Sequence, residues 1–245
     1  MRNYKITLQY DGTRYDGWQK QGNTANTIQG KLEQILSRMA GCTVEVHGAG
    51  RTDAGVHAEG QVANFHLESQ RDCREIQRYL NHYLPEDIEV TAIEEVPKRF
   101  HSRLQASGKI YVYRIAVGGA KHVFERRQLW AVEEPLDVEA MRRAAGILEG
   151  RHDFKSFCAN KRMKKSTVRT LQRISIEELP GELRLVFQGD GFLYHMVRIL
   201  TGTLLEVGKG VYGPGYMEEI LAGCSRELAG PCVPARGLCL RQVYY

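Results

Sequence analysis

The sequence lacks any apolar run long enough to cross a membrane. It contains no stretch of about 18 consecutive apolar residues, the length that a transmembrane helix needs. Residues 1–5 also lack the apolar stretch of a secretory signal peptide. A hydrophobic content of 42% with 26% charged residues is typical of a globular domain. We therefore expect a cytoplasmic protein with no membrane contact.

Motifs that bind a metal ion or a nucleotide cofactor are also lacking. The six cysteines form no C-x-x-C pair and no spacing typical of zinc sites. His47, His57 and His66 lie close in the chain, but no cysteine or carboxylate pattern joins them into a ligand set. No phosphate-binding loop of the form G-x-x-x-x-G-K-[ST] occurs. The sequence therefore predicts no metal and no cofactor.

One segment that is present, residues 48–58, surrounds a single carboxylate with small residues. Three glycines and three alanines flank Asp53, and Arg51 lies two positions before it. Small residues let a bulky ligand approach the backbone closely, and a nearby cation favours the ionised carboxylate. This combination suits an anionic nucleophile or base that acts on a large polyanion. From the spacing alone, a tight turn with a surface ion pair is an equal alternative.

The segment closely resembles the signature of the TruA-type tRNA pseudouridine synthases. In that family the aspartate of this motif is the catalytic nucleophile, so the resemblance assigns this role to Asp53. Further matches follow in the family's order and cover nearly the whole chain. They lie at residues 10–19, 99–103, 109–114 and 191–198.

Hydrophobic periodicity predicts an α+β fold in two halves, residues 1–104 and 105–245. In the first half it indicates the order β-α-β-β-α-β of a ferredoxin-like (split βαβ) unit. The expected elements are a strand at 4–10, a helix at 28–39 closed by Gly41, strands at 42–47 and 61–67, a helix at 76–84 and a strand at 88–95.

The second half repeats this order of elements. The resemblance implies that the two antiparallel sheets lie side by side around a central cleft. The expected elements are strands at 109–117, 168–176, 183–188 and 238–243, helices at 137–150 and 193–207, and a short helix near Pro214.

Two residues of the second half are candidates for the other wall of the cleft. Alternation along the strand at 109–117 places Tyr111 and Tyr113 on one face. From the residues alone, both tyrosines are expected to pack half-buried in the sheet. The resemblance matches Tyr111 to the tyrosine that stacks on the target base, whereas Tyr113 keeps the packing role. Arg198 lies beside the apolar stripe of its helix, where a buried charge needs a partner, and the resemblance points to Asp53. The alternative is an arginine whose stem crosses the helix surface to water.

Basic residues gather in three segments, 98–103, 125–127 and 161–165, within a net charge of +5. Each alone is typical of a solvated surface. Together with the aromatic residues Phe100 and Phe124 they fit contacts to phosphates and bases. Trp18, in a polar loop, is either half-packed or a further candidate for RNA contact. The remaining candidate RNA ligands are Arg14, Arg51, Lys161, Arg162, Lys164 and Lys165.

The resemblance implies an isomerase that converts uridine to pseudouridine at positions 38, 39 and 40 of the tRNA anticodon stem-loop. It also implies a homodimer formed chiefly through the second half. Two other classes stay open from the residues. A non-catalytic RNA-binding protein would not need Asp53 paired with Arg198. A glycosidase or hydrolase needs a second carboxylate, and we read Asp190, the other acid in these motifs, as a turn residue.

Overall fold

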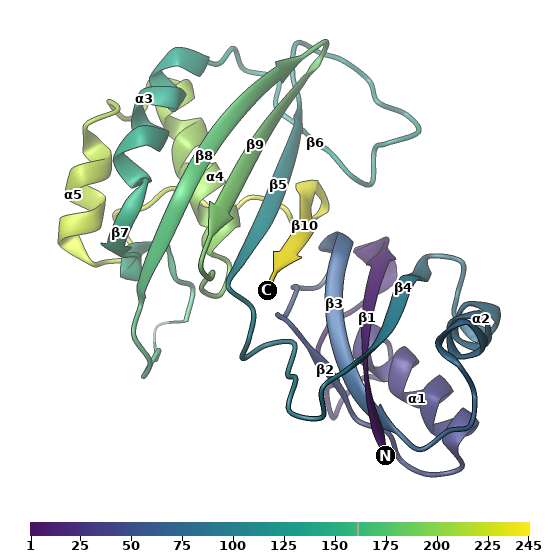
Figure 1. Cartoon of the computed structure of the whole chain (residues 1–245). Coiled ribbons are helices and arrows are strands. Elements are labelled where there is room, and N and C mark those ends of the chain that lie inside the picture. Colours follow the sequence, from purple (N-terminus) through teal and green to yellow (C-terminus); the bar gives the residue numbers. More distant parts are fainter. Residues whose placement is uncertain (161) are drawn as a thin grey trace. The chain divides into compact units, whose positions relative to one another are not determined.

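The computed structural model describes residues 1–160 and 162–245, which form two compact units (Figure 1). Unit 1 holds Met1–Ser107 together with Cys239–Tyr245, and unit 2 holds Gly108–Leu238. The last strand, β10 (Leu238–Tyr244), is therefore almost entirely part of unit 1, although the sequence placed it in the second half. Ten strands and five α-helices lie within the described residues, which confirms the α+β class.

The sheet of unit 1 is built around β1 (Arg2–Tyr10) and β3 (His57–Leu67). Its order is β4-β1-β3, with β4 (Ile88–Val96) and β1 antiparallel to their neighbours. Strand β2 (Val46–Gly48) lies antiparallel along the later part of β3, and β10 lies parallel to its first residues. The order β-α-β-β-α-β is the one that the sequence predicted for residues 1–96, whereas the parallel pairing with β10 was not.

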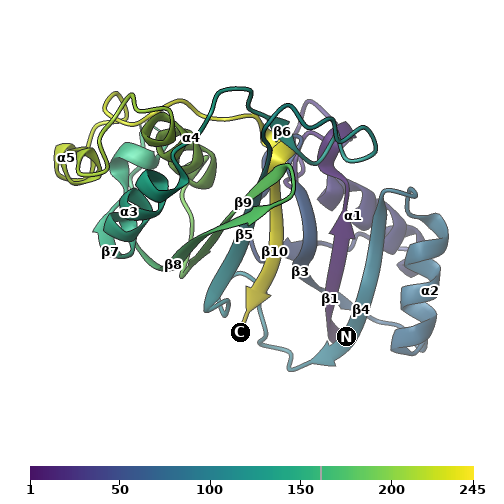
Figure 2. The same ribbon diagram turned by 90° about the horizontal axis from the view of Figure 1, so that it is seen from above.

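Two amphipathic helices cover this sheet, α1 (Ile28–Ala40) and α2 (Cys73–Tyr83), which also pack on each other (Figure 2). The Thr27 side chain accepts a hydrogen bond from the Gly30 N–H and so caps α1. Gly41 ends the helix in the left-handed conformation (φ 70°), a cap that glycine adopts without strain. The predicted end of this helix is confirmed.

Unit 2 contains the antiparallel order β5-β9-β8-β7, made of β5 (Gly108–Ala116), β9 (Glu182–Gly189), β8 (Val168–Leu179) and β7 (Gly150–Asp153). The two-residue strand β6 (Trp130–Ala131) lies parallel to β5. The sequence missed β6 and β7, which are too short to show a period of two.

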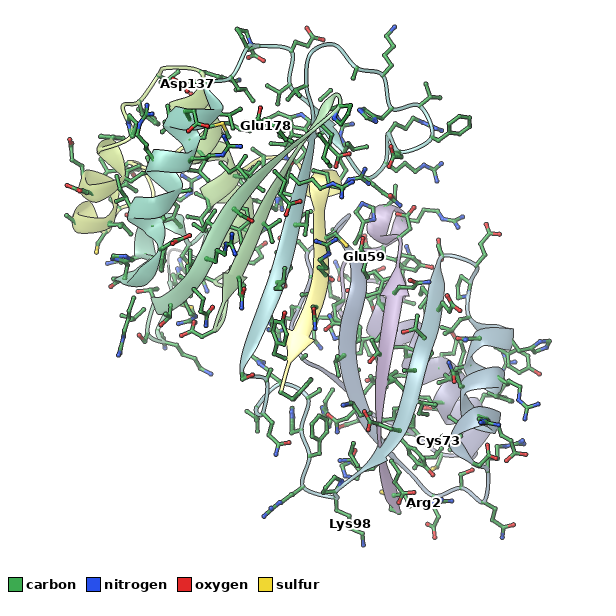
Figure 3. All side chains as sticks on the ribbon, turned by 45° about the horizontal axis from the view of Figure 1, so that its top comes forward. Arg2, Glu59, Cys73, Lys98, Asp137 and Glu178 are labelled. Atoms are coloured by element: carbon green, nitrogen blue, oxygen red, sulfur yellow. The ribbon has the colours of Figure 1, made fainter. Side chains whose placement is uncertain are left out.

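Three helices belong to unit 2: α3 (Val138–Leu148), α4 (Met196–Gly208) and α5 (Tyr216–Gly223). Helix α3 packs on α4 and on β8 (Figure 2), and its N-terminus is capped by Asp137 (Figure 3). Helix α4 begins three residues later than predicted, because His195 adopts a left-handed conformation (φ 60°) immediately before it. No described helix combines the length and apolarity that a membrane crossing needs.

A buried carboxylate fixes β5 against β9. Glu182 is 5% exposed, and it accepts hydrogen bonds from Arg114 Nε (2.7 Å), Arg114 Nη2 (2.9 Å) and Arg184 Nε (2.7 Å). Burial alone would raise the pKa of Glu182, but the hydrogen bonds and charges of the two arginines lower it to about 2. This cluster secures the strand that carries Tyr111.

We predict that Glu182→Gln destabilises the protein by about 3–4 kcal/mol at pH 7, since folding lowers the pKa from 4.5 to about 2 and each pKa unit corresponds to about 1.4 kcal/mol. A carboxylate whose folded-state pKa lies below its ordinary value stabilises the fold above that value. The stability difference between the proteins should therefore shrink as the pH falls from 4.5 to about 2. Urea unfolding at several pH values measures it.

The matched control is Glu178→Gln, which removes the partner of Arg142 on the exposed part of β8 (Figure 3). An exposed pair contributes about 0–1 kcal/mol, so this variant should stay close to the wild type. If the stability that Glu182→Gln loses did not change with pH, the role given to the buried carboxylate would be contradicted.

Candidate active site

Asp53 lies on a tight turn in the loop between β2 and β3. The Val56 N–H donates to the Asp53 carbonyl at 3.1 Å. Gly55, within the turn, has a φ of 77°, which only glycine adopts readily. The Asp53 side chain is partly exposed. The glycine of the motif thus serves the turn that presents the carboxylate.

A buried hydrogen-bond network holds the residues before Asp53. The Thr52 hydroxyl and the Tyr10 hydroxyl lie 2.8 Å apart, and both side chains are buried. The Gln61 amide donates to the Gly50 carbonyl at 2.9 Å. Burial raises the pKa of Tyr10, so its hydroxyl stays protonated. Neutral, buried hydrogen bonds therefore hold the Asp53 loop in place.

Residues 11–19 pack directly on the Asp53 loop, and glycine makes this approach possible. A Cβ at Gly12 would lie 1.9 Å from the Val56 carbonyl oxygen, and one at Gly17 would lie 2.7 Å from the Thr52 carbonyl oxygen. The Trp18 N–H donates to that same Thr52 oxygen at 3.0 Å. The loop is thereby held on a second side.

Of the two roles expected for Trp18, the structure shows packing, and the alternative of contact with RNA is wrong. Its side chain is 2% exposed, and its indole covers Gly48, where an added Cβ would lie 2.4 Å from the ring. Sequence reasoning assigned this tryptophan to a polar loop because its neighbours are polar. It also missed Tyr10 as a partner of Thr52, since the two lie 42 positions apart.

The two candidate RNA ligands of unit 1 are exposed arginines with partners in the fold. Arg51 Nε donates to the Gln19 side chain at 3.0 Å. Arg14 donates to Asp87 from Nε (3.0 Å) and Nη2 (2.7 Å), while its side chain remains 62% exposed. Their contacts with RNA stay predictions.

In unit 2, Tyr111 and Tyr113 lie on β5. Tyr111 is 7% exposed, and its ring meets Phe192 edge-on with centroids 5.0 Å apart. Tyr113 is fully buried and donates to the Pro234 carbonyl at 2.7 Å, which confirms its predicted packing role. The Phe192 contact fixes the plane of the Tyr111 ring.

Arg198 lies in the first turn of α4 and is partly exposed. Its Nε donates to the Val233 carbonyl at 2.8 Å, and its own carbonyl accepts from the Val233 N–H at 3.4 Å. A backbone segment 35 positions away thus holds the guanidinium group. Asp53 and Arg198 belong to different units, so their pairing and the cleft stay predictions.

The basic segment at 161–165 is only partly described. Lys161 lies outside the described residues, whereas Arg162, Lys164 and Lys165 are exposed between the 3₁₀ turn η2 (Lys155–Phe157) and β8. Within the described chain, no three histidine, cysteine or carboxylate side chains gather as they would around a metal ion.

Comparison with known proteins identifies the family. The family model for tRNA pseudouridine synthase matches residues 6–104 and 144–245. This chain belongs to the tRNA pseudouridine synthase family. The matched segments contain Asp53 and Arg198, and Tyr111 lies between them.

Curated relatives align with this chain along its whole length. It is 46% identical to tRNA pseudouridine synthase A of Bacillus sp. (strain KSM-64) and to tRNA pseudouridine synthase A 1 of Clostridium tetani (strain Massachusetts / E88). It is 43% identical to tRNA pseudouridine synthase A of Brevibacillus brevis (strain 47 / JCM 6285 / NBRC 100599). Each alignment spans 245 residues and covers 100% of both chains.

We predict that Tyr10→Phe and Thr52→Val each lower kcat of the family's reaction, pseudouridine formation in tRNA, by about tenfold, because misplacement of a catalytic loop is costly. KM should stay within about twofold, since neither buried side chain contacts substrate. The kcat of the double variant should be little lower than that of either single variant, because both changes break the same hydrogen bond.

Tyr15→Phe is the matched control. It removes a tyrosine hydroxyl that donates to Asp87 in the same unit, and kcat should not change. Equal losses of kcat in Tyr15→Phe and Tyr10→Phe would show that the network only stabilises the fold.

Proposed function

We propose that the chain isomerises uridine to pseudouridine at positions 38, 39 and 40 of the tRNA anticodon stem-loop. Family membership along the full length supports the reaction and the substrate class. The observation that carries the site is the Asp53 carboxylate, presented on a glycine turn whose flanks are held by buried hydrogen bonds. A preorganised carboxylate of this kind suits a nucleophile.

The reaction breaks the N1–C1′ glycosidic bond, turns the uracil while it stays bound, and joins C5 to C1′. The proton leaves C5 and N1 gains one, so substrate and product have the same composition and no cofactor is consumed. Asp53 acts as the nucleophile. The glycines and alanines around it leave room for the ribose and the base.

The target base must leave its stack before it reaches Asp53, at an energetic cost of a few kcal/mol. Stacking on Tyr111 offsets part of this cost, at about 1–3 kcal/mol per base. The edge contact with Phe192 supports this role because it holds the tyrosine ring in one plane. Phosphate contacts from Arg14, Arg51 and the segment 161–165 offset the rest of the energetic cost of removing the base from its stack.

Arg198 supports Asp53 in this proposal by keeping the carboxylate ionised and oriented. The hydrogen bond from Nε to Val233 fixes the side chain by its inner nitrogen. A planar guanidinium held in this way suits a carboxylate partner. The proposal further includes a homodimer formed chiefly through the second half, which acts in the cytoplasm.

Incubation of a tRNA transcript with the protein alone tests the function. Pseudouridine mapped at positions 38–40, without release of uracil, is the expected result. A non-catalytic RNA-binding protein would leave the transcript unchanged, and a hydrolase would release free uracil. Asp190 lies at a bend after β9, and its side chain accepts from the Thr170 N–H at 3.0 Å, which supports a structural role rather than that of a second catalytic carboxylate.

We predict that Asp53→Asn abolishes pseudouridine formation and leaves tRNA affinity within about twofold, because it removes the nucleophile and keeps the side-chain shape. Asp16→Asn, an exposed carboxylate of the neighbouring loop that accepts from Thr24, is the control and should retain activity. Turnover of Asp53→Asn within about tenfold of wild type would refute the assignment.

We predict that Arg198→Met lowers kcat by about a hundredfold, as for loss of a positioned charge in an active site. Arg198→Lys should recover only part of the rate, since an ammonium cannot donate to Val233 and to a carboxylate in one plane. A normal rate in Arg198→Met would show that Arg198 does not act on Asp53.

A further inference from the structure

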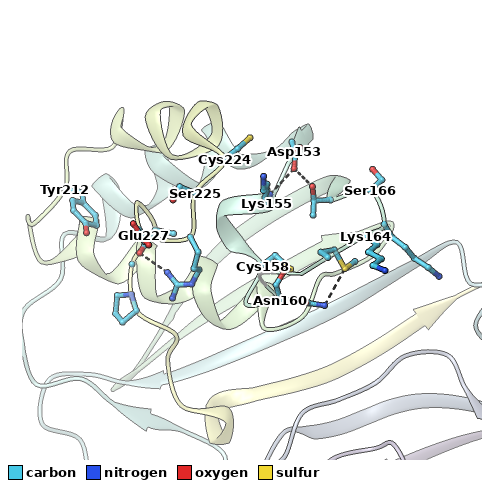
Figure 4. A pocket seen from close by; sticks show the side chains of 17 residues that line it. Asp153, Lys155, Cys158, Asn160, Lys164, Ser166, Tyr212, Cys224, Ser225 and Glu227 are labelled. Atoms are coloured by element: carbon cyan, nitrogen blue, oxygen red, sulfur yellow. Dashed lines mark hydrogen bonds between the residues drawn. The ribbon is translucent and has the colours of Figure 1, made fainter.

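A cavity lies within unit 2 (Figure 4), and neither Tyr111 nor Arg198 is among its lining residues. Its volume is about 900 Å³. One wall is formed by described residues between Asp153 and Thr167 and the other by residues 224–231, while Tyr212, between α4 and α5, completes the lining. The lining residues are Asp153, Lys155, Cys158, Asn160, residues 163–167, Tyr212 and residues 224–231 except Leu228.

The lining is positively charged. It contains four cations, Lys155, Lys164, Lys165 and Arg226, against two carboxylates. None of the three lysines forms an ion pair with any residue that the structure describes. Asp153 is used within its own loop, where it accepts from the Thr167 hydroxyl (2.5 Å) and from the Lys155 N–H (3.0 Å). Unpaired lysines around a cavity favour an anionic ligand.

The pocket also offers apolar and aromatic surface, which a phosphate ion alone would not use. Tyr212 lies at one end and Lys164 at the other (Figure 4). The Tyr212 ring packs on Tyr216 with centroids 4.7 Å apart, so it is supported from behind. Met163 and Pro231 add apolar surface. A ligand with a flat ring and a phosphate matches this separation of an aromatic end from a cationic end.

The back wall of the pocket is rigid. Gly230 N–H donates to the Thr203 hydroxyl at 3.0 Å, and a Cβ at Gly202 would lie 1.9 Å from the Pro231 carbonyl oxygen. These contacts seat the wall on α4. Two residues further on, Val233 holds Arg198. The pocket is therefore formed before any ligand arrives, as small-molecule sites generally are.

We propose that this pocket binds a nucleoside phosphate, with the base at Tyr212 and the phosphate at Lys155, Lys164 and Lys165. The source of this ligand is either a nucleotide of the substrate RNA other than the reacting uridine, which rests on the proposed function, or a free nucleotide. The RNA is favoured, since the chain lacks a glycine-rich phosphate loop and a second contact on one long ligand gains from its high effective concentration.

Alkylation of cysteines in the wild-type protein tests the site directly. Cys224 lines the pocket and is partly exposed, whereas the exposed Cys42 in unit 1 serves as the internal reference. A tRNA transcript at about four times its KM should slow alkylation of Cys224 by about fivefold and leave Cys42 unchanged, because bound ligand excludes the reagent. In a second arm, uridine 5′-monophosphate at millimolar concentration replaces the tRNA.

If tRNA protects Cys224 from alkylation, the pocket binds the substrate RNA. If uridine 5′-monophosphate protects Cys224 and tRNA does not, the pocket binds a free nucleotide. Protection by neither overturns the proposal, while pseudouridine formation in the same sample would leave the proposed function intact. Conversely, protection of Cys224 by tRNA without pseudouridine formation would refute the proposed function and support the proposed pocket. Protection that grows with protein concentration in the absence of ligand would show that a second copy covers the pocket, and would overturn the proposal.

Charge removal in the pocket provides the second readout. The triple variant Lys155→Gln, Lys164→Gln, Lys165→Gln should raise KM for tRNA about tenfold with kcat within about twofold, because binding is lost before the chemical step. The slope of log K against log salt should fall by about one, since the three lysines share one phosphate contact and each such contact contributes about 0.7–0.9.

A control with the same loss of charge separates a local effect from net charge. Arg71→Gln, Arg74→Gln and Arg78→Gln remove three exposed cations on and beside α2 of unit 1. The triple variant that carries these three substitutions should have a KM for tRNA within about twofold of wild type. An equal rise of KM in both triple variants would overturn the assignment of the pocket.

Discussion

The close approach of two backbone segments in unit 1 is the constraint on which the candidate active site depends. Gly12 and Gly17 bring residues 11–19 against the Asp53 loop, where any side chain would collide with main-chain atoms. Backbone cannot move aside as the end of a flexible side chain can. The contact positions the Trp18 N–H on the Thr52 carbonyl. The turn that carries Asp53 is thereby located by its neighbours as well as by its own sequence.

The buried network beneath this loop explains how a glycine-rich segment can be ordered. Glycine and alanine contribute little packing, and glycine has many backbone conformations to lose on folding. Tyr10, Thr52 and Gln61 compensate with hydrogen bonds shielded from water, where such bonds are stronger and an unmade one is costly. The site thus combines open space around the carboxylate with a rigid base.

Unit 2 follows the same principle with different partners. The Arg198 side chain is held by the Val233 carbonyl, and the strand of Tyr111 is held by Glu182 at its far end. In both cases, a long-range polar contact fixes an element that carries a candidate functional group. The wall of the cationic pocket shares the segment that holds Arg198, so pocket and arginine belong to one packed body.

The sequence by itself determined most of the regular elements, and its motifs identified the family. Helix α1, its cap at Gly41 and the order of elements around Asp53 follow from local signals, namely apolar periodicity, capping residues and glycine spacing. The tertiary structure alone decided the burial of Trp18, the pairing of Arg14 with Asp87 and the grouping of β10 with unit 1. Each of these depends on residues dozens of positions apart, and their contact is set by packing of the whole chain, which no local pattern encodes.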